Sequence, residues 1–138
     1  MSRADRVRAR LNGFDALLVS DLTNIRWLTG FSGSNGYVVL TPSAMHLVTD
    51  GRYGVQAAHQ LAAAGVAAEV HVGLSGAAIV QHLQALLGGH ATVGFEAARV
   101  SYQQYTDWAK AFATSLQPAV GIIEAERRTK DAGEIALM

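Results

Sequence analysis

Apolar positions follow two different periods along the chain, and together they predict alternating helices and strands. Ala4, Val7 and Leu11 repeat at helical spacing, whereas residues 15–19 are continuously apolar after the first, as in a strand covered on both faces. The predicted helices are 4–11, 22–28, 52–64, 75–87 and 102–116, and the predicted strands are 15–19, 37–40, 45–49, 66–72, 92–95 and 120–123.

The residues between these elements indicate how they connect. Residues 41–44, Thr-Pro-Ser-Ala, form a proline turn that joins strands 37–40 and 45–49 into an antiparallel hairpin. Ser2 with Asp5, and Ser101 with Gln104, resemble capping boxes at the start of helices. Strands that alternate with helices elsewhere favour parallel pairing, so the pattern predicts an α/β fold with a mixed sheet.

Composition narrows the class of protein. The 138 residues, half of them hydrophobic, are enough for one domain with its own core. The absence of cysteine excludes disulfides, thiolate metal sites and thiol nucleophiles. Eleven basic side chains balance eleven acidic ones, and no stretch approaches the length of a membrane span. We therefore expect no nucleic-acid partner and no membrane partner.

The glycine-rich segment 30–36, Gly-Phe-Ser-Gly-Ser-Asn-Gly, is the first candidate for a functional loop. Nucleotide-binding loops follow a strand and precede a helix, whereas this segment follows a predicted helix and precedes a predicted strand. The order of elements therefore disfavours nucleotide binding. It leaves two interpretations, a tight connection or a loop that touches a ligand or a neighbouring domain.

Metal and hydrolase motifs are weak in this sequence. The five histidines, at positions 46, 59, 71, 82 and 90, are scattered without a close ligand pair, so ordinary surface or hydrogen-bonded roles are predicted for them. Spacing alone leaves open that the fold brings some of them together. Residues 73–77 resemble a serine-hydrolase elbow but lack its final glycine, which favours a helix cap at Ser75.

Residues 50–53, Asp-Gly-Arg-Tyr, lie where a predicted strand meets a helix, an edge at which α/β proteins often present functional groups. In one interpretation Asp50 caps the helix and Tyr53 packs inward. In the other, Arg52 projects toward a carboxylate of a substrate or of a partner subunit, because the guanidinium fork suits that group.

Three segments together resemble one family. These are 15–19 (DALLV), 24–33 (NIRWLTGFSG) and 47–53 (LVTDGRY), and residues 127–138 (RRTKDAGEIALM) are similar to the segment that leads into that family's catalytic domain. The family is that of creatinase, prolidase and Xaa-Pro aminopeptidase, the pita-bread metallopeptidases, and the resemblance is to its N-terminal domain. It implies a mixed, mostly parallel six-stranded sheet with one β-hairpin and helices on both faces, a ribonuclease H-like arrangement.

The resemblance also implies a function and partners. Family members cleave before proline with two divalent metal ions held in a C-terminal domain, so we expect no catalytic residue, metal or cofactor in this chain and no activity from it alone. The chain would contribute to a homodimer and to gating of the active-site mouth for short proline-containing peptides, in the cytoplasm. By position, Phe31, Ser34 and Arg52 are the candidates for lining that mouth or the interface.

The chain is expected to divide into a domain at 1–124 and, at 125–138, a linker with the first turn of the helix leading to the absent catalytic domain. Asp131 with Glu134 resembles the cap of that helix. Two alternatives remain open. The domain could belong to a creatinase-like amidinohydrolase, or the chain could be a stand-alone α/β interaction module.

Overall fold

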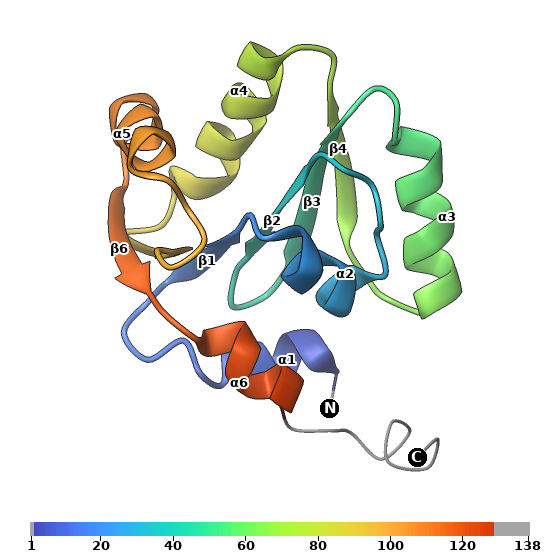
Figure 1. The fold of residues 1–138 in the computed structure, drawn as a ribbon, viewed down its shortest axis with the longest axis horizontal. Helices are drawn as coiled ribbons and strands as arrows, with labels where there is room; N and C mark the ends of the chain where they lie inside the picture. Colours follow the sequence, from blue (N-terminus) through green and yellow to red (C-terminus); the bar gives the residue numbers. More distant parts are fainter. Residues whose placement is uncertain (1, 129–138) are drawn as a thin grey trace.

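The computed structural model describes residues 2–128, which form one six-stranded sheet and six helices that pack against it (Figure 1). The helices are α1 (Arg3–Arg8), α2 (Leu22–Thr29), α3 (Gly54–Ala64), α4 (Gly76–Leu87), α5 (Tyr102–Ala111) and α6 (Ile122–Arg128). The strands are β1 (Ala16–Val19), β2 (Gly36–Leu40), β3 (Met45–Asp50), β4 (Glu69–Gly73), β5 (Thr92–Glu96) and β6 (Ser115–Ala119).

The six strands lie in the order β4-β3-β2-β1-β5-β6. Strand β2 runs antiparallel to both of its neighbours, and the other three pairs are parallel. The hairpin of β2 and β3 closes through Thr41, whose amide donates to the carbonyl of Ala44 at 2.9 Å. The predicted mixed, mostly parallel six-stranded sheet with one hairpin is therefore confirmed.

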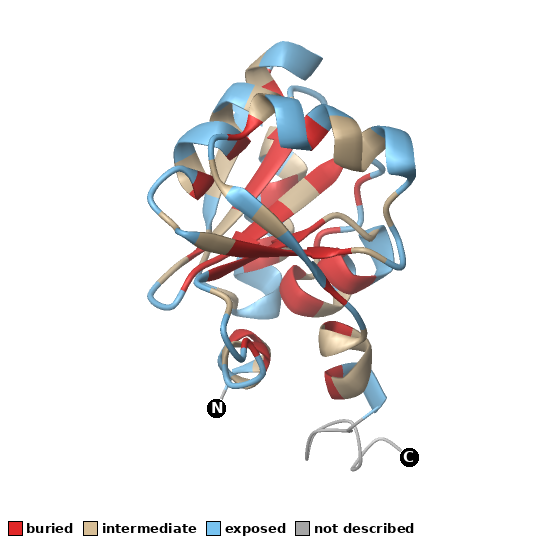
Figure 2. Cartoon of the chain, turned by 90° about the vertical axis from the view of Figure 1, so that its left-hand side faces the viewer, coloured by how far each residue is buried: buried red, intermediate tan, exposed pale blue. Residues whose placement is uncertain are grey.

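Helices cover both faces of the sheet, as predicted (Figures 1 and 2). Successive residues of β1 point to opposite faces, so Leu17 and Val19 join one core and Ala16 and Leu18 join the other. The first core contains side chains of α1, α2, α3 and α6, and the second contains side chains of α4 and α5. A strand buried on both sides explains why residues 16–19 are continuously apolar.

The predicted end of helix 102–116 and the predicted strand 120–123 are wrong. Helix α5 ends at Ala111 rather than at residue 116, the final strand is Ser115–Ala119, and the predicted strand 120–123 is the start of helix α6. Strand β6 lies at the edge of the sheet and is largely exposed, so it lacks the apolar pattern of a buried strand and tolerates Pro118. Gly121, with φ +77°, turns the chain, and Ile123 is buried from a helix rather than from a strand.

Strand β4 begins at Glu69, three residues later than predicted. In the described part of the chain, no helix is long and apolar enough to cross a membrane. Asp131 and Glu134 lie outside the described residues, and the division of the chain at residue 124 stays a prediction.

Candidate functional site

Polar side chains gather where β3 ends, beside the glycine-rich segment 30–36. We call this group the Asp50 cluster; it comprises Ser34, Asn35, Asp50, Arg52 and Tyr53. Arg52 donates to the Asp50 carboxylate from its backbone amide (2.9 Å), from Nε (3.2 Å) and from NH2 (2.8 Å), and Asn35 Nδ2 donates at 2.9 Å. The hydroxyl oxygens of Ser34 and Tyr53 are 2.7 Å apart. Two segments 15 or more residues apart are thereby joined at one edge of the sheet.

These contacts set the charges of the cluster. The bonds from Arg52, followed by the bond from Asn35, hold the pKa of Asp50 well below its ordinary value of 3.8. The same ion pair raises the pKa of Arg52, and the hydrogen bond with Ser34 lowers the pKa of Tyr53. The cluster therefore presents a fixed ion pair with a polar rim.

One interpretation of Asp50 is wrong. Asp50 does not cap helix α3, because Tyr53 occupies the N-cap position without a side-chain bond and the Asp50 oxygens accept from Arg52 and Asn35. Within the described chain, the carboxylate that Arg52 binds is that of Asp50. The Arg52 side chain is still 68% exposed, so part of its guanidinium faces solvent.

Phe31 is a core residue, only 1% exposed, and this burial contradicts a direct lining role for its side chain. The backbone of the loop lies directly over its ring: a Cβ added to Gly33 would lie 2.3 Å from Phe31 Cζ, and one added to Gly36 would lie 2.9 Å from Cε2. The ring also meets the ring of Tyr53 edge to face, with centroids 5.8 Å apart. Phe31 therefore supports the loop and Tyr53 from beneath, whereas Ser34 and Arg52 remain candidates for contact.

A second polar group surrounds Glu96, at the end of β5. We call it the Glu96 network; it comprises Ser20, Asp21, Asn24, Glu96 and Glu124. The backbone amides of Ser20 (2.8 Å) and Asp21 (2.9 Å) donate to Glu96 Oε1, and Asn24 Nδ2 donates to Glu96 Oε2 at 2.6 Å and to Glu124 at 3.0 Å. Burial raises the pKa of Glu96, although these bonds oppose the shift.

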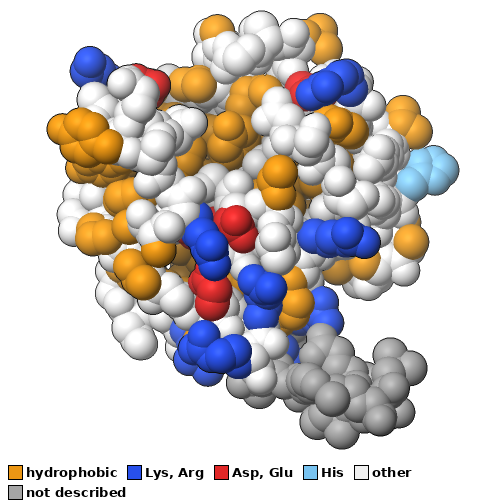
Figure 3. Space-filling model, viewed as in Figure 1, with side chains coloured by type: hydrophobic (Ala, Val, Ile, Leu, Met, Phe, Trp, Pro, Cys, Tyr) orange, Lys and Arg blue, Asp and Glu red, His pale blue; other side chains and the backbone are white. Residues whose placement is uncertain are grey.

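The Glu96 network continues into helix α6, which is the last described element. Arg127 donates to Asn24 Oδ1 at 3.1 Å, and Arg99 lies 3.6 Å from the Glu124 carboxylate. Glu126 forms ion pairs with Arg6, at 3.0 Å, and with Arg10. Figure 3 shows acidic and basic side chains gathered in the lower half of this face, around α6. Helix α6 is therefore held to α1 and α2 in one orientation.

The sequence interpretation missed the Glu96 network, because its bonds join residues 72 to 103 positions apart. The position of Glu96 directly after the apolar strand 92–95 could have indicated this network. The carboxyl ends of the parallel strands β1 and β5 meet there. A buried carboxylate at that place needs donors, and the start of the next helix supplies them.

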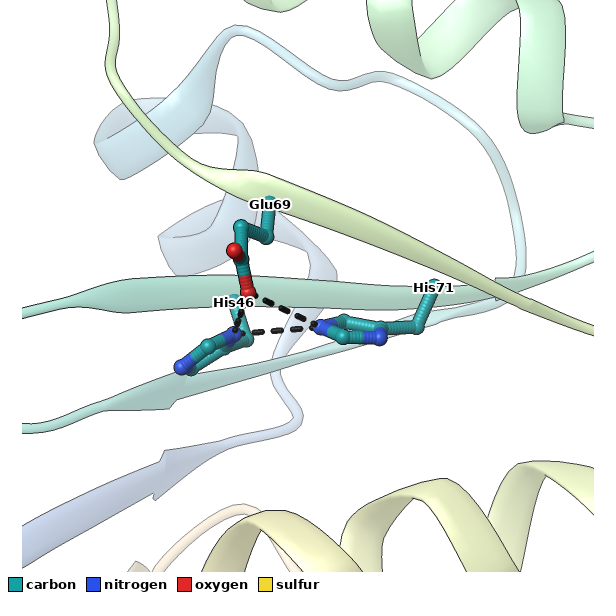
Figure 4. Close-up of side chains that lie close together, drawn as sticks. All are labelled: His46, Glu69 and His71. Carbon is teal, nitrogen blue, oxygen red and sulfur yellow. Dashed lines mark hydrogen bonds and ion pairs between the residues drawn. The ribbon is translucent and has the colours of Figure 1, made fainter.

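The structure also brings together histidines that looked scattered. His46 on β3 lies beside Glu69 and His71 on β4, with their nearest side-chain atoms 3.1 to 3.7 Å apart (Figure 4). Burial, followed by the neighbouring His46 and His82, lowers the pKa of His71. Among the described residues this is the one group of three or more potential ligands that could hold a metal ion. It contains a single carboxylate, so the described residues do not fit the two-metal centre that the resemblance implies.

Comparison with known proteins places this arrangement in a family. The family model described as the creatinase/prolidase N-terminal domain matches residues 3–129. The N-terminal domain of the cytoplasmic peptidase PepQ from Mycobacterium tuberculosis is 36% identical, with a TM-score of 0.78, and the match covers 89% of this chain and 96% of that one. The Xaa-Pro dipeptidase from Bacillus anthracis is 25% identical, with a TM-score of 0.87, over 97% of this chain.

Among curated proteins, the chain is 27% identical to an uncharacterized peptidase of Bacillus subtilis, YqhT, in an alignment of 136 positions that covers 91% of this chain. The chain spans 35% of the length of that peptidase and 37% of the Bacillus anthracis dipeptidase. The mixed six-stranded sheet and the match over nearly all described residues lead to one conclusion. The chain belongs to the creatinase/prolidase N-terminal domain family.

Proposed function

We propose that this chain is the non-catalytic N-terminal domain of a cytoplasmic Xaa-Pro aminopeptidase or Xaa-Pro dipeptidase. The family match over residues 3–129 carries the proposal. It is supported by solved relatives that are described as an Xaa-Pro dipeptidase and as Xaa-Pro aminopeptidases. The cytoplasmic location rests on the relative described as a cytoplasmic peptidase.

In this proposal the hydrolytic step belongs to a C-terminal catalytic domain that holds two divalent metal ions. One solved relative, 31% identical, is the N-terminal domain of a proposed metallopeptidase from Corynebacterium diphtheriae. The role of this chain is therefore to position the catalytic domain and to shape access to it.

Helix α6 supports the positioning role. It is fixed by ion pairs of Glu126 with Arg6 on α1 and with Arg10 just after α1, and by the contacts of Glu124 and Arg127 with Asn24. These contacts fix the direction of the chain as far as Arg128. We expect α6 to set the orientation of the catalytic domain.

The Asp50 cluster supports the roles in gating and dimerisation. Ser34 and Arg52 are exposed there. Leu74, 87% exposed, lies against the turn at Gly51, and Val55, 76% exposed, begins the helix that follows. Protein interfaces combine an apolar centre with a polar rim, and arginine is enriched in them. We expect this surface to face a second subunit and the mouth through which short proline-containing peptides enter.

Activity of the chain by itself tests the non-catalytic role. The 138-residue chain is incubated with manganese and an Ala-Pro peptide, and we expect no hydrolysis above a chelator-treated control. The product of the whole reading frame, if it continues for roughly 200 or more residues with spaced Asp, His and Glu, is expected to release alanine. Metal-dependent turnover by the short chain would contradict the proposal, and hydrolysis of creatine instead of Ala-Pro would identify the amidinohydrolase.

Arg52→Ala in the full-length protein tests the surface role. We expect a raised KM for Xaa-Pro peptides, a weaker dimer, or both, with folding unchanged. Lys110→Ala, which removes an exposed cation on α5, is the matched control and should alter neither property. Unchanged kinetics and an unchanged dimer in the Arg52 variant would remove Arg52 from the site.

A further inference from the structure

Three potential metal ligands converge on one face of the sheet, on strands β3 and β4. His46 pairs with Glu69 in the parallel register, and His71 follows Glu69 by two residues, so the three side chains project from the same face. His46 Nδ1 lies 3.1 Å from His71 Nε2 and 3.1 Å from Glu69 Oε2, and His71 Nε2 lies 3.7 Å from Glu69 Oε2 (Figure 4). The three atoms form a triangle with two equal sides and one longer side.

The size of this triangle suits a tetrahedral transition-metal ion. With metal–ligand bonds of about 2.0 to 2.1 Å, two ligands of a tetrahedral ion lie about 3.3 Å apart. The observed separations of 3.1, 3.1 and 3.7 Å bracket that value. A point about 2 Å from all three atoms therefore exists, just above their plane, without any change in the strands.

Each of the three atoms can give a lone pair to a cation. The Glu69 carboxylate only accepts, and a neutral imidazole has a proton on one ring nitrogen, so a proton at His46 Nδ1 points to either His71 or Glu69. A cation accepts a lone pair from each of the three atoms at once. The side chains of His46 and His71 are 14% and 25% exposed and that of Glu69 is 73% exposed, so an ion can reach the site from solvent.

We propose that His46 Nδ1, His71 Nε2 and the Glu69 carboxylate bind a single divalent transition-metal ion. Zn²⁺ is the preferred ion, and water occupies the fourth coordination position. Two imidazoles with one carboxylate are ligands that zinc accepts, whereas calcium and magnesium prefer all-oxygen sites. His82 on α4 is not counted as a ligand, because its Nε2 is bonded to the carbonyl of Val72 at 3.2 Å. The site requires no residue outside the described chain and goes beyond the proposed function.

The consequence of metal binding is a link between β3 and the edge of the sheet. Strand β4 is the outermost strand on its side and has β3 as its one neighbour within the sheet. An ion held by His46 on one strand and by Glu69 and His71 on the other joins the two directly. It therefore stabilises the edge strand and the loop that follows it, which carries Leu74.

Zinc titration of the chain, prepared without an affinity tag and stripped with a chelator, tests the site. We expect saturable binding of one Zn²⁺ per chain, and a midpoint of thermal unfolding raised on the order of 10 °C at a zinc concentration 100 times Kd. His71→Gln and Glu69→Gln should each weaken binding about tenfold or more. His59→Gln, which changes an exposed histidine on α3, is the matched control and should leave the affinity unchanged.

Ring-nitrogen NMR separates this site from nonspecific binding. Zinc should shift Nδ1 of His46 and Nε2 of His71, the two nitrogens that face each other. Glu69→Gln keeps the test valid if His71→Gln fails to fold, because Glu69 is mostly exposed. The inference is overturned if zinc does not saturate a single site, if both variants bind zinc like the unaltered chain, or if zinc binds through other ring nitrogens.

Discussion

The Asp50 cluster and the Glu96 network each hold one carboxylate with several donors, yet they differ in burial and in the origin of the donors. Asp50 accepts four bonds from residues 2 and 15 positions away, and its main partner Arg52 is 68% exposed. Glu96 accepts three bonds from residues 72 to 76 positions away and is itself only 7% exposed. The first cluster is a local surface feature, whereas the second joins distant parts of the fold.

The two carboxylates also respond oppositely to their surroundings. Hydrogen bonds dominate at Asp50 and lower its pKa, whereas burial dominates at Glu96 and raises its pKa in spite of three hydrogen bonds. Solvent screens the exposed ion pair of Asp50 and Arg52, so that pair contributes little to stability. The donors around Glu96 are buried, so losing their acceptor costs more. We infer that the exposed cluster is available for binding and that the buried network maintains the fold.

The largest effect is expected from Glu96→Ala. The change leaves the amides of Ser20 and Asp21 and the side chain of Asn24 without their buried acceptor, so the free energy of unfolding should fall by about 3 kcal/mol. Urea denaturation at neutral pH measures it. Asp107→Ala, which removes an exposed carboxylate on α5, is the control and should stay within about 0.5 kcal/mol. A fall in the free energy of unfolding of less than about 1 kcal/mol for Glu96→Ala would mean that the buried network contributes no more to stability than the exposed Asp50 cluster.

A smaller loss is expected from Gly33→Ala, which tests the support beneath the Asp50 cluster. The added methyl group would lie 2.3 Å from Phe31 Cζ, and the buried ring cannot move without disturbing the core. Overpacking of this kind should lower the free energy of unfolding by about 2 kcal/mol, measured by urea denaturation. Gly76→Ala is the matched control, because no atom lies within 4 Å of its added Cβ. Equal stabilities of the two variants would show that the loop is not held against Phe31.

The pH dependence of stability should have opposite signs at the two carboxylates. The stabilisation lost in Asp50→Asn should be fully present above about pH 3.8 and shrink as the pH falls further, because the folded pKa is lowered. The advantage of Glu96 over Glu96→Gln should be largest below about pH 4.5 and shrink as the pH rises through the raised folded pKa. Urea denaturation between about pH 3 and pH 7 measures both, and slopes of the same sign would contradict the contrast.

The smallest effect is expected from Asn35→Ala. It removes one donor from Asp50, but the three bonds from Arg52 remain. The free energy of unfolding should fall by less than about 1 kcal/mol in urea denaturation, because the bond from Thr49 Oγ1 to the Asn35 carbonyl also remains. A loss of about 2 kcal/mol or more would mean that the exposed cluster contributes to the fold as the buried network does.

Local signals in the sequence predicted most of the fold. Ser2, Ser75 and Ser101 each accept a hydrogen bond from a backbone amide at the start of a helix, as the sequence indicates. Capping depends on residues three positions apart, so it is readable without tertiary information. Strand β6 escaped prediction because an edge strand has little apolar pattern and owes its conformation to pairing with β5.

The candidate sites divide in the same way. Asp50 and Arg52 were identifiable because they are two residues apart at the end of an apolar strand. Phe31 was predicted to line the mouth or the interface, but its side chain is buried beneath Gly33 and Gly36, which depends on how the loop folds back. The approach of Asn24 to Glu96, and of His46 to His71, depends on strand order and register, which no local pattern specifies.

The sequence by itself determined most of the elements, the hairpin, the mixed sheet and the family resemblance, because apolar period, caps and turns act over a few residues. Only the tertiary structure decided which polar groups meet. Parallel pairing of β1 with β5 places Glu96 over the start of α2, and parallel pairing of β3 with β4 places His46 beside Glu69 and His71. Such contacts depend on register, and register is set by the packing of the whole sheet between its helices.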